Sequence, residues 1–269
     1  MKLDEQQLAS LERDGFLVLP DLFNLREVQL LQSRLPALLA QDSPANIIEK
    51  ASGEVRTAMG IHLRDVVFAK LAHHPRLIEA ARQIRPEALY IQQVKVNVKA
   101  AFSGEVWQWH YDFATHHHDD GVPEPLALNL HVFLDDVNEF NGPLYFIPGS
   151  HKFGAHPAVH DTSTTSYPLW VVDQAVVRNM ITNAEAIDPG RAIVAATGKR
   201  GTGLIFFDTL VHGSPVNLSP WDRSIFSLIL NPVSNASTRD SRPDFKHHRD
   251  FSDVQAAADD CLQNGAELS

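Results

Sequence analysis

Short apolar runs bounded by turn-forming residues recur along this chain and predict a protein built mainly from β-strands. The runs at residues 16–19, 127–134, 144–147, 203–207 and 225–230 have the length of ordinary strands, and most are flanked by glycine, proline, asparagine or aspartate. Runs of this kind indicate strands buried in a sheet. We therefore expect a mainly β fold whose core spans about residues 16–235.

Helical spacing of apolar residues is confined mainly to the N-terminal third of the chain. Residues 4–14 carry leucines among charges and end at an Asp-Gly pair, and residues 24–40 form an apolar stripe interrupted at Pro36. Residues 75–85 begin with proline, which suits the first turn of a helix. These stripes predict helices that flank a sheet. The polar tail is expected to close with a further helix at residues 253–262.

The segment Trp107–Phe113 places an imidazole and a carboxylate two residues apart in apolar and aromatic surroundings. Side chains at i and i+2 of a strand share a face, so His110 and Asp112 can hold one ion between them. A second histidine, His212, follows the apolar run at residues 203–207. Two histidines and one carboxylate leave other coordination positions open, and this ligand set is typical of non-haem Fe(II) oxygenases.

A His-X-Asp pair alone is also explained by an ordinary core or surface histidine beside a carboxylate. Arg223 favours the metal hypothesis, since it lies eleven residues after His212 and starts the next apolar run. Arginine is suited to bidentate capture of a carboxylate. A metal triad followed by such an arginine is what the binding of 2-oxoglutarate beside iron requires.

Residues 89–98 alternate cleanly, with valines on one face and Gln93, Lys95 and Asn97 on the other. A polar row on a strand indicates a solvated face in an open sheet, or a ligand-facing row in a barrel with an internal site. We favour the ligand-facing interpretation, because the candidate metal strand follows within fifteen residues.

Two other stretches near the candidate metal residues carry histidine. In the run at residues 127–134, Asn129 and His131 share a face, and we expect one of them to line the pocket. The stretch His116–His118 invites a second metal site, but consecutive side chains diverge in a helix and in a strand. The Asp-Gly pair that follows favours an exposed turn instead.

Length, charge and cysteine content limit the kinds of protein and partner that the sequence allows. The chain has 269 residues, of which 44% are hydrophobic, and we expect one domain spanning residues 1–269. The net charge of −10 argues against a nucleic-acid partner, which needs a basic face. Cys261 is the only cysteine, the N-terminus lacks the apolar core of a signal peptide, and no apolar run reaches membrane-spanning length. We therefore expect a cytoplasmic protein with no membrane partner.

Four motifs, in this order along the chain, resemble the phytanoyl-CoA dioxygenase superfamily. They lie at residues 104–113, 119–123, 133–144 and 147–151. Within the superfamily, the sequence most resembles the bacterial branch that holds ectoine hydroxylase and the hydroxylases of free proline and leucine. The similarity extends over roughly residues 5–235, which is most of the chain.

The resemblance implies a double-stranded β-helix, also called a jelly roll or cupin-like fold. It implies a 2-oxoglutarate-dependent non-haem iron dioxygenase that uses Fe(II), 2-oxoglutarate and O2 to hydroxylate an unactivated C–H bond. The expected iron ligands are His110, Asp112 and His212. Arg223, assisted by Ser214 and Lys95, is expected to bind 2-oxoglutarate, and Trp107 to form a wall of that site.

The substrate implied by the resemblance is a small molecule, with a free amino or imino acid as first choice. The candidate substrate contacts are Arg56, Gln93, Asn97, Asn129 and Trp170. Arg56 is the only cation among them and so the natural partner of a carboxylate, although an exposed surface arginine is the alternative. The irregular stretch at residues 151–200 is expected to cover the substrate, mainly through residues 160–170. The pattern leaves open whether the protein is a monomer or a homodimer.

Three alternatives remain open. A non-enzymatic, cupin-like metal- or ligand-binding protein would share both fold and triad. An acyl-CoA substrate is less well supported, because the chain is acidic and shows no basic cluster near the covering stretch. An ectoine-type or other small-carboxylate hydroxylase is the third; here residues 114–116 read Ala-Thr-His where the ectoine enzymes usually have an acidic residue, Thr and Trp.

Overall fold

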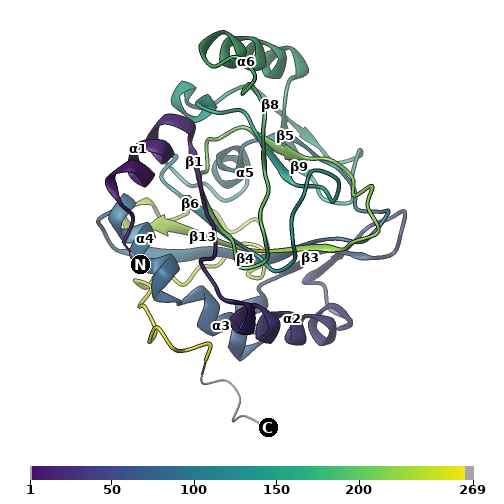
Figure 1. The fold of residues 1–269 in the computed structure, drawn as a ribbon, viewed down its shortest axis with the longest axis vertical. Coiled ribbons are helices and arrows are strands. Elements are labelled where there is room, and N and C mark those ends of the chain that lie inside the picture. The colour runs from purple at the N-terminus through teal and green to yellow at the C-terminus, as the bar shows by residue number, and fades with distance from the viewer. Residues whose placement is uncertain (1, 264–269) are drawn as a thin grey trace.

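The computed structural model describes residues 2–263 and contains two antiparallel sheets that face each other (Figure 1). The larger sheet has the order β1-β11-β6-β13-β4-β3-β2 and the smaller has β10-β7-β12-β5-β9-β8. The larger sheet is built from β1 Phe16–Leu19, β2 Asn46–Ile48, β3 Val55–Met59, β4 Leu89–Lys99, β6 Leu128–Phe133, β11 Gly203–Phe207 and β13 Arg223–Pro232. The smaller is built from β5 Trp107–His110, β7 Leu144–Phe146, β8 Ala158–Asp161, β9 Leu169–Val172, β10 Val194–Ala196 and β12 His212–Ser214.

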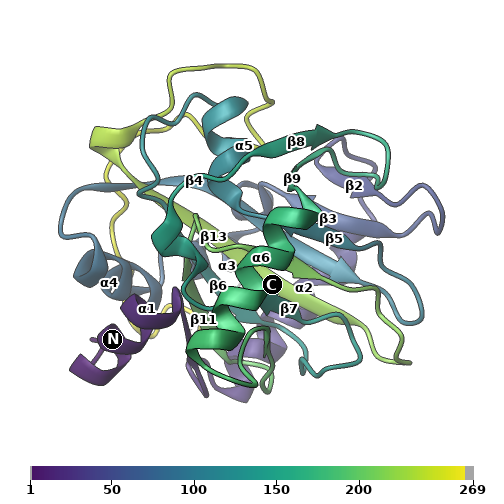
Figure 2. The ribbon, with the colours of Figure 1, turned by 90° about the horizontal axis from the view of Figure 1, so that it is seen from above.

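Helices flank this sandwich (Figure 2). They are α1 Glu5–Asp14, α2 Leu25–Leu39, α3 Val66–Ala72, α4 Pro75–Ile84, α5 Asp112–His118 and α6 Gln174–Ile187, with short 3-10 turns at Ile61–Leu63, Ser150–Phe153 and Val233–Asn235. Apolar side chains of α2, α3 and α4 join those of the larger sheet in one buried cluster. Among the described residues, none of the helices is both long and apolar enough to cross a membrane.

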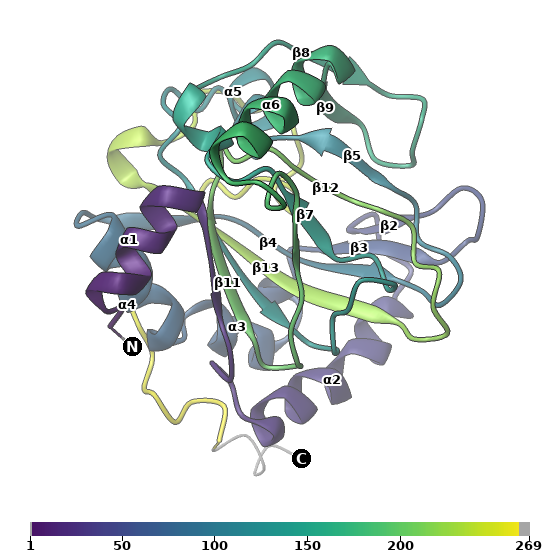
Figure 3. The same ribbon diagram turned by 45° about the horizontal axis from the view of Figure 1, so that its top comes forward.

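Strands far apart in the sequence are neighbours in both sheets (Figure 3). The strand β1 pairs with β11, β4 pairs with β13, and β5 pairs with β12. A second apolar cluster joins the two sheets, and in it the rings of Phe16 and Phe146 stack with their centroids 4.8 Å apart. The predicted jelly-roll fold is confirmed. Because of this fold, residues from the middle and from the end of the chain meet between the two sheets.

Most of the predicted elements are present. The strands expected at residues 16–19, 127–134, 144–147, 203–207 and 225–230 correspond to β1, β6, β7, β11 and β13. The helix α1 ends where Gly15 adopts φ +85°, a left-handed conformation that glycine accepts without strain. These boundaries follow from local signals, namely apolar runs, caps and turn residues.

Three local predictions are wrong. Pro36 does not interrupt α2, because it lies in the last turn and removes only one helical hydrogen bond. Residues 253–262 contain no helix. The segment 112–118, expected as the end of a strand and an exposed turn, is the helix α5, and His116 within it is buried. The stretch 151–200 is also more regular than expected, since it holds β8, β9, α6 and β10.

Candidate metal centre and substrate pocket

Three side chains converge between the sheets in a geometry that suits one metal ion. His110 ends β5, His212 begins β12, and these two residues are register partners in the smaller sheet. Asp112 is the first residue of α5, so the carboxylate comes from the turn that follows the strand rather than from the strand itself. Its two oxygens lie 3.8 Å from His110 Nε2 and 4.0 Å from His212 Nε2.

Both imidazoles are oriented by the backbone. Nδ1 of His110 lies 2.6 Å from the carbonyl oxygen of Gln108, and Nδ1 of His212 lies 2.9 Å from that of Leu210. Nδ1 therefore carries the proton and donates it, which leaves the Nε2 lone pair for an ion. Burial lowers the pKa of His110 to about 3, so this ring is neutral and able to ligate.

The carboxylate completes a suitable donor set. Burial disfavours charge on Asp112, but the neighbouring His212, Lys95 and His110 outweigh it and lower the pKa of the carboxyl. The three ligating atoms lie within 4.8 Å of one another, and no other cluster of His, Cys, Asp or Glu in residues 2–263 meets that criterion. Two nitrogens and one oxygen, with space beside them, fit an iron ion that must keep positions free.

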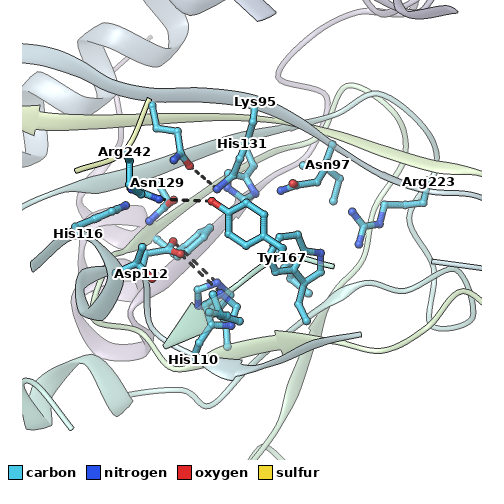
Figure 4. Close-up of a pocket in the computed structure, with 18 residues that line it drawn as sticks. Lys95, Asn97, His110, Asp112, His116, Asn129, His131, Tyr167, Arg223 and Arg242 are labelled. Carbon is cyan, nitrogen blue, oxygen red and sulfur yellow. Dashed lines mark hydrogen bonds and ion pairs between the residues drawn. The ribbon is translucent and has the colours of Figure 1, made fainter. Parts of the chain in front are cut away.

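A pocket opens next to this triad, between the two sheets (Figure 4). The polar row of β4 forms one wall of it, with Gln93, Lys95 and Asn97 among the lining residues. Asn129 and His131 of β6 line it as well, so both of the polar residues on that face reach the pocket. The prediction that the β4 row faces a ligand site therefore agrees with the observed placement.

Arg223 lies at one end of the pocket and is 2% exposed. Its Nε donates to the carbonyl oxygen of Gly142 at 3.0 Å, and its Nη2 reaches the same oxygen and Ser214 Oγ at 3.2 Å. Burial lowers the pKa of Arg223 to about 9, which leaves the guanidinium charged at neutral pH. Ser214 does not line the pocket; its hydroxyl accepts from Arg223 and donates to the carbonyl oxygen of Gly142 at 2.9 Å.

Lys95 provides a second buried cation among the lining residues. Its Nζ donates to Gln93 Oε1 at 2.6 Å, and Gln93 in turn donates to the carbonyl oxygen of Lys246 at 2.6 Å. Burial lowers the pKa of Lys95, while the charge of Asp112 opposes that shift. Lys95 and Gln93 therefore form a polar wall of the pocket next to the metal ligand Asp112.

Several polar atoms of the pocket are buried and have no hydrogen-bond partner among residues 2–263. They are Thr115 Oγ1, His116 Nδ1, Asn129 Nδ2 and both ring nitrogens of His131. A buried polar group without a partner is costly, and ordered solvent or a ligand commonly supplies the missing bond. This side of the pocket is therefore suited to a small polar molecule.

Arg56 and Trp170 are not brought into the pocket, and the expectation that they contact substrate there requires correction. Arg56 is 1% exposed and donates to Glu105 and to the carbonyl oxygen of Val106. Trp170 donates from Nε1 to Asp119 at 3.0 Å, and its ring stacks on a histidine of α5. Both side chains are occupied by partners that the sequence spacing does not reveal.

The sequence alone missed four polar residues of the pocket: Thr115, His116, Tyr167 and Arg242. Arg242 comes from the irregular segment after β13 and donates from Nε to Asp120 Oδ1 at 2.7 Å. Its Nη1 lies 3.5 Å from the hydroxyl of Tyr167. The Asp-Gly sequence at 120–121 predicted a turn, but nothing local marked Asp120 as the partner of a residue 122 positions later.

The chain is similar over most of its length to proteins of known activity. The family model described as phytanoyl-CoA dioxygenase matches residues 11–225. An ectoine dioxygenase from Sphingopyxis alaskensis is 36% identical over 243 residues, covering 87% of this chain and 77% of that protein. An L-proline trans-4-hydroxylase from Streptomyces griseoviridis is 34% identical over 247 residues, covering 90% and 91%.

Solved structures of related proteins are also similar to this chain over most of its length. The crystal structure of EctD from S. alaskensis with 2-oxoglutarate and 5-hydroxyectoine superimposes with a TM-score of 0.80 at 34% identity, covering 95% of this chain and 86% of that one. The structure of the same protein with bound Fe has a TM-score of 0.81 at 33% identity.

Proposed function

The chain belongs to the phytanoyl-CoA dioxygenase family, and on that premise we propose that it hydroxylates a C–H bond of a small free amino or imino acid, using Fe(II), 2-oxoglutarate and O2. The observation that carries this proposal is one pocket lined by a two-histidine, one-carboxylate triad and by two arginines, Arg223 and Arg242. We assign one arginine to a carboxylate of 2-oxoglutarate and the other to the carboxylate of the substrate.

His110, Asp112 and His212 hold the iron. Iron bound there supplies the oxidising power for C–H hydroxylation, coupled to the decarboxylation of 2-oxoglutarate to succinate and CO2. Burial keeps His110 neutral, and the Nδ1 contacts with backbone carbonyls leave Nε2 of both imidazoles for the ion. The charge of Lys95 favours the ionised form of Asp112.

Arg223 binds the distal carboxylate of 2-oxoglutarate. Its burial suits it to a charge-assisted bond, because little water competes for the guanidinium. Ser214 holds the guanidinium by its own hydroxyl, so it acts through Arg223. Lys95 and Trp107, which both line the pocket, assist in binding the cosubstrate.

Arg242 binds the carboxylate of the substrate. It takes the role that the sequence suggested for Arg56, since it is the guanidinium from the substrate side that lines the pocket. Thr115 presents a buried, unpartnered hydroxyl to the same pocket and is suited to bond that carboxylate. Gln93, Asn97 and Asn129 supply further polar contacts, while Tyr167 and Leu169 cover the pocket.

An amino or imino acid is favoured over ectoine by residues 114–116, which read Ala-Thr-His where the ectoine enzymes usually have an acidic residue, Thr and Trp. The unused hydrogen-bonding atoms of His116, Asn129 and His131 suit a small molecule of either class that carries nitrogen and carboxylate groups. The ectoine dioxygenases remain the second candidate class, because one of them is 36% identical over 87% of this chain.

Other properties follow from composition. We propose a cytoplasmic enzyme that acts as one dioxygenase domain and binds no nucleic acid, since the single Cys261 suits a reducing compartment and the charge is −10. Monomer and homodimer both remain compatible with the fold.

The experiment is a screen of free amino acids, imino acids and ectoine with purified protein, Fe(II) and 2-oxoglutarate. We expect succinate release together with a hydroxylated product for at least one amino or imino acid. Turnover of ectoine alone would move the substrate to the second class. Absence of succinate with every substrate contradicts the dioxygenase assignment.

A further inference from the structure

Tyr167 covers the pocket from a segment with no regular structure. It belongs to residues 162–168, which connect β8 to β9, and it is 8% exposed. Its ring lies across the pocket in Figure 4, and the centroid is 5.3 Å from that of Trp107, another lining residue. Since neither a helix nor a strand fixes this segment, its position depends on side-chain contacts.

Ser166, the residue before Tyr167, makes the hydrogen bonds that hold this segment in place. Ser166 donates twice to the carboxylate of Glu105, from its backbone nitrogen at 2.7 Å and from its hydroxyl at 2.6 Å. The same hydroxyl accepts a bond from the backbone nitrogen of Lys50 at 2.8 Å. The covering segment is therefore held to the body of the protein next to its pocket-facing ring.

Glu105 is itself fixed by Arg56, the arginine that does not reach the pocket. Arg56 Nη1 lies 3.0 Å from Glu105 Oε2, and the two side chains are 1% and 18% exposed. The backbone nitrogen of Glu105 donates to Glu49 at 2.7 Å. Burial disfavours charge on Glu105, but the bonds from Ser166 and the charge of Arg56 outweigh it and lower the pKa of the carboxyl, so the carboxylate stays ionised.

Arg56 also supports the pocket wall. Its guanidinium carbon lies 3.9 Å from the ring centroid of Trp107, and Nη2 donates to the carbonyl oxygen of Val106 at 2.9 Å. Arg56 comes from β3, which is paired on both edges by β2 and β4. One buried cation therefore connects a rigid strand to both Trp107 and Glu105.

We infer that Arg56, Glu105 and Ser166 form a latch that positions Tyr167 over the bound substrate. Arg56 and Glu105 are positioning residues, since neither lines the pocket. The latch keeps the substrate in place and water out while 2-oxoglutarate is consumed, so it determines how much of that consumption yields hydroxylated product. The inference rests on the proposed function, but the position of the segment can be measured without turnover.

The experiment compares Ser166→Ala and Glu105→Gln with a matched control, Ser163→Ala. Ser163 lies in the same segment, is exposed, and bonds Asp161 rather than Glu105. Amide hydrogen exchange is measured on the protein without cofactor or substrate, and the ratio of succinate to product is measured with the best substrate. Exchange at residues 163–168 is expected to rise about tenfold in Ser166→Ala and Glu105→Gln, because a charge-assisted hydrogen bond is weakened or lost.

The ratio of succinate to product is expected to rise in the same two variants and to stay at the wild-type value in Ser163→Ala. Arg56→Lys keeps the charge but loses the forked geometry, so it should fall between wild type and Glu105→Gln. Wild-type exchange in both latch variants overturns the inference, even if no substrate is found. Raised exchange with an unchanged ratio on a turned-over substrate also overturns it. A wild-type protein that releases no succinate contradicts the proposed function and leaves the exchange result to decide the latch.

Discussion

The metal side and the substrate side of the pocket are built differently. His110, His212 and Arg223 lie on paired strands, and the two histidines are register partners. Tyr167 and Arg242 come from segments outside the helices and strands, and each reaches the pocket through partners distant in sequence. The two histidine ligands and Arg223 are therefore placed on the sheets, while Tyr167 and Arg242, two of the proposed substrate contacts, come from connecting segments.

This difference has a physical reason. A metal site requires ligand atoms fixed within tenths of an ångström, and strands with locked rotamers provide that precision. Segments that contact the substrate can differ between related proteins, because loops accept changes in length and sequence with little loss of stability. We therefore expect substitutions on the two sides to affect separate kinetic quantities.

The largest effect is expected at the triad. His110→Ala, Asp112→Ala and His212→Ala should each abolish iron-dependent turnover, since each removes one of three ligands. The protein should remain folded, because no apolar core residue is lost. Succinate release and circular dichroism check this together, and full activity in any one variant contradicts the metal assignment.

Arg223→Ala should act on the cosubstrate alone. Loss of one partner of a buried charged pair costs on the order of 2–5 kcal/mol, which corresponds to about one to four decades in the apparent 2-oxoglutarate requirement. Iron binding should persist. Saturation curves for 2-oxoglutarate measure the effect, and an unchanged requirement shows that another cation holds the carboxylate.

Arg242→Gln should act on the substrate and spare the cosubstrate. We expect the substrate KM to rise roughly tenfold to a thousandfold, for the same physical reason. Arg239→Ala is the control, since it removes an exposed arginine from the same segment. Because Asp120 is 1% exposed and loses its partner, the unfolding free energy is measured separately. If the 2-oxoglutarate requirement rises as much as the substrate KM, the metal side and the substrate side of the pocket do not act independently.

A smaller effect is expected on the pH dependence of stability, through a contact that anchors the segment carrying Arg242. His248 in that segment packs on His62, with ring centroids 4.6 Å apart. Burial lowers the pKa of His62 to about 3 and that of His248 to about 4. Both folded-state values lie below that of an unfolded histidine, so stability is present above pH ~6.5 and is lost as the pH falls toward 4.

The expected loss between pH 7 and pH 5 is about 2 kcal/mol for each of these histidines, because the unfolded chain binds a proton there that the folded chain does not. Urea unfolding at the two pH values measures it. His62→Phe should give a shallower pH dependence than wild type. An equal dependence in both proteins shows that His62 is not buried in its neutral form.

The metal side could be predicted from the sequence because its signals are local. His110, Asp112, His212 and Arg223 stand in or next to apolar runs, and their order along the chain, together with the family resemblance, indicated a shared site. The helical position of Asp112 was missed. The predicted ligand set is unaffected, because a residue two positions past the end of a strand can still point toward the strand's last side chain.

The substrate side could not be predicted in the same way. Arg56 was assigned to the substrate because it is a cation, but its partner Glu105 lies 49 residues away and no local pattern links them. Arg242 lies in a polar tail with no periodicity, and only its pairing with Asp120 brings it to the pocket. Gln93 and Asn97 were recognised because alternation along β4 places them on one face.

Calorimetric titration under anaerobic conditions tests most directly whether His110, Asp112 and His212 form the metal site on which 2-oxoglutarate binds. Fe(II) is titrated into wild type and Asp112→Ala, and 2-oxoglutarate is then titrated with and without iron. We expect a single iron per chain in wild type, loss of that binding in Asp112→Ala, and binding of 2-oxoglutarate at least tenfold tighter when iron is present. Iron binding retained in Asp112→Ala, or equal binding of 2-oxoglutarate with and without iron, would contradict the assignment.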